Sequence, residues 1–315
     1  MPEEPVFAVM YDFDKTLSPK DMQEYAFIPA IGMTPEEFWA ECDRMMRAYD
    51  MDQILAYMYV MTNKARGTFL FTRETLRALG KAVELFEGVP GWFRRINAYA
   101  GKLGMKAEHY IISSGLKEII AGTKIAGSFE RIYAADYCYD ERGVPFWPSM
   151  AVNFTSKTQF LFRINKGVLN VTDNDPLNEF MPEDRRRVPF RNMIYIGDGL
   201  TDVPCMKLVR SNGGHAIAVY QDSREMVNAL LLQGRVDYVL KADYSKGGAL
   251  EKTVFAVMDQ AAAMNRTIGL HVGSVETARA QLEARKKQAW ARAAGENGEM
   301  TEGSGPDEGN GPCGI

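Results

Sequence analysis

Cysteine and histidine are scarce in this sequence, with four cysteines and three histidines among 315 residues. The cysteines show no paired spacing and no C-x-x-C motif, which argues against a disulfide framework and against a zinc site. We interpret them as the reduced thiols of a cytoplasmic protein. The histidines lack metal-ligand spacing, so we expect all three to have structural roles.

Excess positive charge and long apolar runs are also lacking. The formal net charge is -4, which argues against a nucleic-acid partner bound through its phosphates. No window of about 18 apolar residues occurs, so we predict no membrane span, and the N-terminus lacks the features of a secretion signal. Hydrophobic residues make up 46% of the chain, which is enough for a substantial core in one large domain or two smaller ones.

The most informative segment is an apolar run that stops at two acidic residues. Residues 6–11 are apolar, a composition typical of a fully buried strand, and Asp12 and Asp14 follow directly. Burial of a carboxylate is costly without a partner, so we expect this strand to end at a crevice that holds a cation. Ligands of open α/β sheets bind outside the carboxyl ends of the strands. The alternative is that Asp14 or Ser18 only caps a helix.

Strands and helices alternate along most of the remaining chain. After the first strand and a helical region, further strands are predicted at residues 109–112, 131–134, 193–196, 216–220 and 236–240. Helices are predicted between them, including one from Lys157 to Lys166 that Ser156 would cap. This alternation predicts an α/β fold with a doubly wound, mostly parallel sheet, which is a Rossmann-like core.

The helical region is predicted to be an insertion in this core. Thr34 and Glu37 form a capping box, Asp50 and Thr72 would cap the next two helices, and Gly88 would end the third. The predicted division is a core at 1–17 and 88–265, a helical cap at 18–87, an appended helix at 266–294 and a disordered tail at 295–315.

The predicted appended helix is rich in arginine and lysine, which we interpret as a solvated basic face. We place its N-cap at Ser274, so that a break separates it from the preceding helix at 248–264.

Three predicted strands end in polar segments, and a lysine at a predicted helix start lies between the last two. These are Asp12-Phe13-Asp14, Ser113-Ser114-Gly115, Lys157 and Gly197-Asp198-Gly199. In this order they resemble the motifs of the haloacid dehalogenase-like (HAD) superfamily of aspartate-dependent phosphohydrolases, over about residues 6–17 and 105–245. The helical insertion is similar to the family's C1-type cap, and residues 87–91 are similar to the phosphoserine-phosphatase-like branch.

The resemblance implies a chemical role for each motif. Asp12 would be the nucleophile that forms an aspartyl-phosphate, and Asp14 would be the general acid and base. Lys157 would be the third catalytic residue, holding a phosphoryl oxygen in the transition state. Ser113, Ser114 and Gly115 would bind the phosphoryl group of the substrate.

The resemblance also implies Mg2+ as the cofactor, because a hard dication with oxygen ligands offsets the repulsion between a carboxylate and a phosphate dianion. Asp12 and Asp198 would be side-chain ligands, and Asp14 would bind the ion through its carbonyl. Asp202 would complete the metal site by orienting Lys157 or a metal-bound water.

Alternatives stay open for three of these assignments. Ser114 could bind phosphate in place of Ser113, although the motif spacing favours Ser113. Lys166 could replace Lys157, but its position suits a cation that offsets a helix C-terminus. Asp202 could simply cap the helix that follows it.

Asp14 also favours phosphate hydrolysis over two other activities that the motifs resemble, haloalkanoate dehalogenation and ion pumping. Haloalkanoate dehalogenases do not need an acid there, because halide leaves unprotonated. P-type pumps share Asp-Lys-Thr but require membrane spans. Asp21 lies near the position that binds the substrate amine in the phosphoserine-phosphatase-like branch, although it is shorter than the usual glutamate and Thr201 replaces the usual asparagine of the fourth motif.

We therefore expect a Mg2+-dependent phosphatase that hydrolyses a small phosphorylated metabolite, with a phosphoserine-like substrate as one hypothesis. The partner is a small molecule, with neither nucleic acid nor membrane involved, and the oligomeric state stays open. Two alternatives are a phosphotransferase that uses the same intermediate and a catalytically silent protein that keeps the fold.

Overall fold

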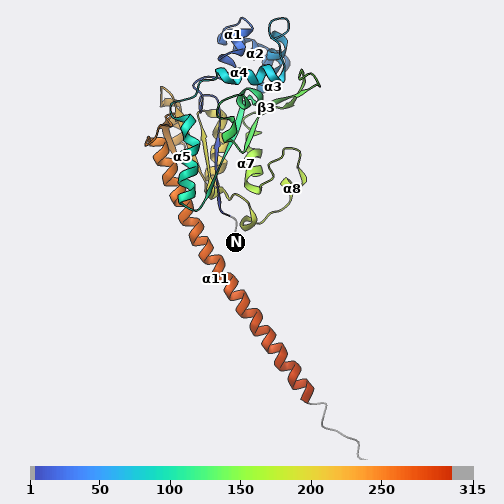
Figure 1. Ribbon diagram of the computed structural model, residues 1–315, viewed down its shortest axis with the longest axis vertical. Coiled ribbons are helices and arrows are strands. Elements are labelled where there is room, and N and C mark those ends of the chain that lie inside the picture. Colours follow the sequence, from blue (N-terminus) through green and yellow to red (C-terminus); the bar gives the residue numbers. More distant parts are fainter. Residues whose placement is uncertain (1–3, 300–315) are drawn as a thin grey trace, which may run out of the picture. The chain divides into compact units, whose positions relative to one another are not determined.

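The computed structural model describes residues 4–299 (Figure 1). The chain divides into two units, one ending at Ala262 and the other beginning at Ala263. The first unit contains both the sheet and the helical insertion, so the predicted division between core and cap stays an interpretation within one unit.

One sheet of seven strands, in the order β4-β3-β2-β1-β5-β6-β7, forms the centre of the first unit. The strands are β1 (Val6–Tyr11), β2 (Lys106–Leu116), β3 (Arg131–Tyr139), β4 (Pro145–Met150), β5 (Met193–Gly197), β6 (His215–Tyr220) and β7 (Tyr238–Lys241). All neighbouring pairs are parallel except β3 and β4, which are antiparallel. The predicted α/β fold with a mostly parallel sheet is confirmed.

Strand β4 has no counterpart in the sequence prediction. Its residues 145–150 include Pro145 and Pro148, and proline normally argues against a strand. The strand lies at the edge of the sheet, where a missing N–H group is tolerated because one side of the strand has no partner.

Helices cover both faces of the sheet, as Figure 1 shows for α5 (Val89–Lys102) and α7 (Lys157–Lys166). Side chains alternate between the faces of a strand, so Phe7 and Val9 of β1 pack in one cluster with Trp92 of α5. Ala8 and Met10 pack in a second cluster with Phe160 of α7. The other core helices are α6 (Lys117–Ala121), α8 (Asp175–Asn178), α9 (Val203–Ser211) and α10 (Glu225–Leu232).

The insertion between β1 and β2 is helical, as predicted, and lies beyond the carboxyl ends of the strands (Figure 1). It contains α1 (Phe27–Ala30), α2 (Pro35–Tyr49), α3 (Gln53–Lys64) and α4 (Arg73–Leu79), after a 3-10 turn at Met22–Glu24. The capping box of Thr34 and the cap at Thr72 are confirmed.

Two other predicted helix boundaries in this region are wrong. Asp50 has a φ of 50° and ends α2, whereas Asp52 caps α3 by accepting hydrogen bonds from the N–H groups of Ile54 and Leu55. Gly88 has a φ of 81° and precedes α5, while α4 already ends at Leu79. The left-handed conformation at both positions depends on the surrounding tertiary structure, which the local sequence does not reveal.

Helix α11 runs from Ala249 to Glu299, so the predicted break before Ser274 is wrong. Ser274 lies inside the helix, and its hydroxyl donates to the carbonyl of Leu270 at 2.9 Å. Residues 249–299 contain no proline, and an interior glycine costs only about 1 kcal/mol, so nothing local stops the helix. Residues 295–299 of the predicted tail belong to α11, and residues 300–315 lie outside the described residues.

Cys42, Cys138 and Cys205 are free thiols, and Cys313 lies outside the described residues. Within residues 4–299, no helix combines the length and the apolar composition that crossing a membrane requires.

Candidate active site

The predicted site residues converge at the carboxyl edge of the sheet. Asp12 follows β1 directly, and its backbone N–H donates to the carbonyl of Ile196 in the neighbouring strand β5. Asp198 follows β5, and Lys157 begins α7. Parallel strands that pair in register end together, which brings residues far apart in the sequence to one crevice.

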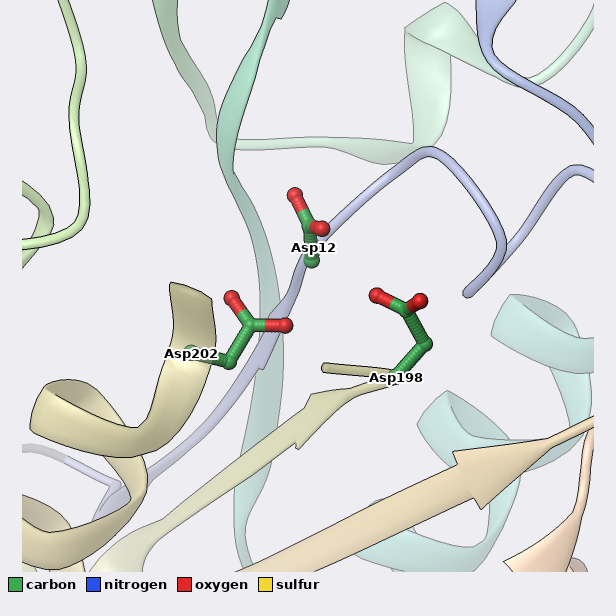
Figure 2. Close-up of side chains that lie close together, drawn as sticks. All are labelled: Asp12, Asp198 and Asp202. Carbon is green, nitrogen blue, oxygen red and sulfur yellow. The ribbon is translucent and has the colours of Figure 1, made fainter. Parts of the chain in front are cut away.

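Three carboxylates share this crevice, as Figure 2 shows. Asp12, Asp198 and Asp202 each offer an oxygen that lies within 4.8 Å of the others. Asp12 and Asp202 are buried, and Asp198 is partly exposed. Asp202 comes from a 3-10 turn (Leu200–Asp202) that precedes α9.

Lys157 joins two of these carboxylates. Its side chain has no solvent exposure, and its Nζ lies 3.1 Å from Asp12 Oδ1 and donates to Asp202 Oδ1 at 2.8 Å. Burial alone would lower the pKa of Lys157, but the charges of Asp12 and Asp202 outweigh it and raise the pKa above its usual value. Lys157 is therefore a permanent cation beside the predicted nucleophile.

The alternatives for Lys157 and Asp202 lose support from the geometry. Lys166 donates to the backbone carbonyls of Leu177 and Glu179, which suits a structural cation at the end of α7. The Asp202 side chain makes no capping hydrogen bond to α9 and instead accepts from Lys157.

The donor set fits a hard divalent cation. Burial is the main cause that raises the pKa of Asp12 to about 6 and the pKa of Asp198 to about 8. A bound cation would stabilise the ionised form of both carboxylates. Asp202 Oδ2 is buried and has no hydrogen-bond partner, which is costly unless a ligand satisfies it. Carboxylate oxygens are the ligands that Mg2+ prefers. Gly197 permits the arrangement, because a Cβ there would lie 2.3 Å from Asp202 Oδ2.

Asp14 occupies a separate position. Its carboxylate is not part of the three-carboxylate cluster; Oδ1 accepts a hydrogen bond from the backbone N–H of Met22 at 2.8 Å. Burial, followed by the charges of Asp21 and Asp12, raises the pKa of Asp14 well above its usual value. A carboxyl that retains its proton can donate it to a leaving group.

Asp21 is already paired. Lys15 Nζ lies 2.8 Å from Asp21 Oδ2, and Lys15 has a φ of 56°, a left-handed conformation that is uncommon outside glycine.

The serine-glycine segment lies inside β2 rather than after it, in a stretch where the pairing with β3 is irregular. Ser113 Oγ accepts a hydrogen bond from the N–H of Gly115 at 3.0 Å, and the carbonyl of Ser114 accepts from the Tyr57 hydroxyl of α3 at 2.9 Å. A Cβ on Gly115 would lie 2.0 Å from the terminal methyl of Met22 and 2.9 Å from Asp14 Oδ2, so a larger residue there would displace these side chains.

A cavity of about 670 Å3 connects these groups with the helical insertion. Its floor contains the predicted residues Asp12, Asp14, Asp21, Ser113, Ser114, Gly115 and Asp198. Its wall contains residues that the sequence reasoning missed, including Gln23, Trp39, Asp52, Tyr57 and Asn153. The helical periodicity of α2 and α3 could have marked Trp39 and Tyr57 as part of one face of the insertion, but no motif identifies any of these residues.

Hydrogen bonds join the insertion to the core across this cavity. The Asn153 amide donates to Asp52 Oδ2 at 3.0 Å, and Tyr57 donates to the carbonyl of Ser114. The Asn153 carbonyl also accepts from the backbone N–H of Lys157. Asn153 therefore contacts both Asp52 of the insertion and the start of α7.

Fold and site together define a Rossmann-like α/β protein with a cluster of three carboxylates at the carboxyl edge of its sheet. The family model of haloacid dehalogenase-like hydrolases matches residues 9–207, and the chain belongs to this family.

Comparison by sequence and by structure finds proteins similar to this chain. An uncharacterized protein from Borreliella burgdorferi is 28% identical over 276 residues, which cover 78% of this chain and 94% of that protein. A HAD family hydrolase from Salmonella enterica serovar Typhi is similar in structure, with a TM-score of 0.52, 15% identity and coverage of 82% of this chain and 73% of that one.

A probable phosphoserine phosphatase from Vibrio cholerae, in unliganded form, also has a TM-score of 0.52, with 13% identity and coverage of 84% and 69%. At these identities the structural similarities establish the shared fold.

Proposed function

We propose that this protein is a Mg2+-dependent phosphatase that hydrolyses a small phosphate monoester through an aspartyl-phosphate on Asp12. The observation that carries the proposal is the position of Asp12: it lines the cavity, pairs with the buried Lys157 and lies two residues before the carboxyl of Asp14. Membership in a hydrolase family supports the reaction class.

Asp12, Asp198 and Asp202 would hold Mg2+, together with the carbonyl of Asp14, because they offer the oxygen donors and the unsatisfied charge described above. The bound ion would offset the repulsion between the phosphate dianion and the attacking carboxylate.

The residues of the chain then divide the reaction into two steps. An Asp12 carboxylate oxygen forms a bond to phosphorus while the bond from phosphorus to the leaving oxygen breaks, and Asp14 gives its proton to that oxygen. Asp14 next takes a proton from a water whose oxygen attacks phosphorus, which breaks the bond to Asp12 and releases phosphate. Ser113 and Lys157 would hold the phosphoryl oxygens throughout.

The test is hydrolysis of a generic aryl phosphate with Mg2+, comparing the wild type with Asp12→Asn. We expect turnover in the wild type and none in the variant, with unchanged far-UV circular dichroism. Asp43→Asn, at an exposed position of α2 outside the cavity, is the matched control and should retain activity. Full activity of Asp12→Asn would overturn the nucleophile assignment.

Product analysis separates hydrolysis from transfer. Phosphate and alcohol released in equal amounts, with added acceptor alcohols present, indicate a phosphatase; a new phosphorylated alcohol would indicate a phosphotransferase. We also propose that the partner is a small phosphorylated metabolite and that the protein works in the cytoplasm, in keeping with its free thiols.

A further inference from the structure

Part of the cavity wall is apolar and aromatic, and these side chains restrict which leaving group fits. Trp39 and Met46 of α2, Ile54 and Tyr57 of α3, and Phe154 of the loop before α7 line it. The Trp39 ring is held in place, because its Nε1 donates to Glu24 Oε1 at 3.2 Å and the ring lies 6.4 Å from that of Tyr57 at 77°. This wall offers apolar contact to an alcohol whose phosphate lies at Asp12.

The cavity contains little positive charge. Among the described residues that line it, Lys15 alone has a cationic side chain, and that side chain is paired with Asp21. The acidic lining residues are Asp12, Asp14, Asp21, Asp52 and Asp198. An anionic group on the leaving alcohol would be desolvated near carboxylates with no free cation to pair with, which is strongly unfavourable.

Gln23 lines the cavity and carries an unsatisfied polar atom. The residue is 2% exposed, and its Oε1 is buried with no hydrogen-bond partner. Both Gln23 and Asp14 line the cavity, and Met22, the neighbour of Gln23 in the sequence, donates its backbone N–H to Asp14. A buried acceptor left unpaired is destabilising, and a donor on a ligand would satisfy it.

We propose that the cavity selects a phosphate monoester whose leaving alcohol carries a hydrogen-bond donor for Gln23 Oε1 and no anionic group. The inference rests on the proposed phosphatase function and deepens it by naming the class of leaving group. It also disfavours phosphoserine, because the carboxylate of phosphoserine would face Asp21 and Asp52 without a cation.

Two substrate pairs test this inference on the wild-type enzyme. 2-Hydroxyethyl phosphate and propyl phosphate have the same length and differ in hydroxyl against methyl, and phosphoethanolamine and phosphoserine differ by one carboxylate. We expect kcat/KM to be about tenfold higher for 2-hydroxyethyl phosphate than for propyl phosphate, as one hydrogen bond provides, and at least about tenfold higher for phosphoethanolamine than for phosphoserine. Preference for phosphoserine, or equal rates within the first pair, would overturn the inference.

Variants assign the preference to Gln23. In Gln23→Met, which keeps the length and removes the carbonyl oxygen, the ratio between 2-hydroxyethyl and propyl phosphate should fall to about one. In Gln53→Met, which alters another glutamine that lines the cavity but is exposed, the ratio should stay as in the wild type. A merely structural role of Gln23 would lower both rates together and leave the ratio unchanged, and that result would overturn the assignment.

A gain of function tests the charge argument. Met46→Lys places a cation on the cavity wall, so the disadvantage of phosphoserine against phosphoethanolamine should shrink several-fold; an unchanged ratio would contradict the charge argument. Absence of turnover with the aryl phosphate and with all four substrates would reject the phosphatase itself. Turnover without these preferences would reject only the selectivity.

Discussion

Removal of the Lys157 charge should destabilise the protein strongly. In Lys157→Met, the carboxylates of Asp12 and Asp202 remain buried but lose the ammonium that now lies 3.1 and 2.8 Å from their oxygens. Removing one partner of a buried ion pair costs about 3–5 kcal/mol, because an uncompensated charge is left in the interior. This is a large part of the stability of a typical domain, which is about 5–15 kcal/mol.

The assay is urea unfolding followed by far-UV circular dichroism, with EDTA present so that no divalent cation replaces the ammonium. A second variant, Lys157→Met with Asp202→Asn, removes one of the two orphaned charges and keeps an oxygen that can accept from the Tyr195 hydroxyl. We expect this double variant to recover about 1–3 kcal/mol relative to Lys157→Met.

Lys166→Met is the matched control on the same helix, since Lys166 binds backbone carbonyls and no carboxylate in the described residues. Its loss should be smaller, on the order of 1 kcal/mol. The reasoning is refuted if Lys157→Met costs no more than this control, or if the double variant is no more stable than the single one.

Three further predictions concern the backbone, the pH dependence of stability and the metal. Gly88→Ala should lower the free energy of unfolding by about 2–5 kcal/mol, since φ is 81° and a Cβ would lie 2.3 Å from backbone atoms of Tyr244; Gly104→Ala, with a φ of 68° and open space, should lower it by about 1–2 kcal/mol. Burial tends to raise the pKa of Glu108, but hydrogen bonds from an arginine, a lysine and a tyrosine outweigh it and lower the pKa to about 2. The stabilisation from Glu108 is therefore complete above pH 4.5 and lost as the pH falls towards 2, so urea unfolding of Glu108→Gln and wild type should differ at pH 7 and converge at low pH. EDTA should abolish turnover and added Mg2+ should restore it and raise Tm, because an ion that binds the folded state stabilises it; activity that survives complete metal removal would contradict the proposed cofactor.

Local sequence signals predicted the parts of the structure that depend on neighbouring residues. The apolar run before Asp12 became the central strand β1, and the helix predicted at residues 157–166 has those bounds, with Gly167 in the left-handed conformation after it. Strand periodicity and the capping boxes at Thr34 and Thr72 extend over a few residues, so a single sequence is sufficient to show them.

Elements that depend on distant partners were missed or misplaced. β4 contains two prolines and exists because it pairs with β3 at the edge of the sheet. The cap of α3 moved from Asp50 to Asp52, whose other carboxylate oxygen accepts from Asn153 about 100 positions later in the chain.

The amino-acid sequence by itself determined the order of polar strand ends and hence the class of chemistry, since each of those signals lies within one short segment. Tertiary structure alone decided that Lys157 is shared between two carboxylates and that Gln23 lines the cavity and carries a buried, unpaired oxygen. Both arrangements arise from the packing of segments that are distant in the chain, where burial and charge are set by neighbours that no local pattern specifies.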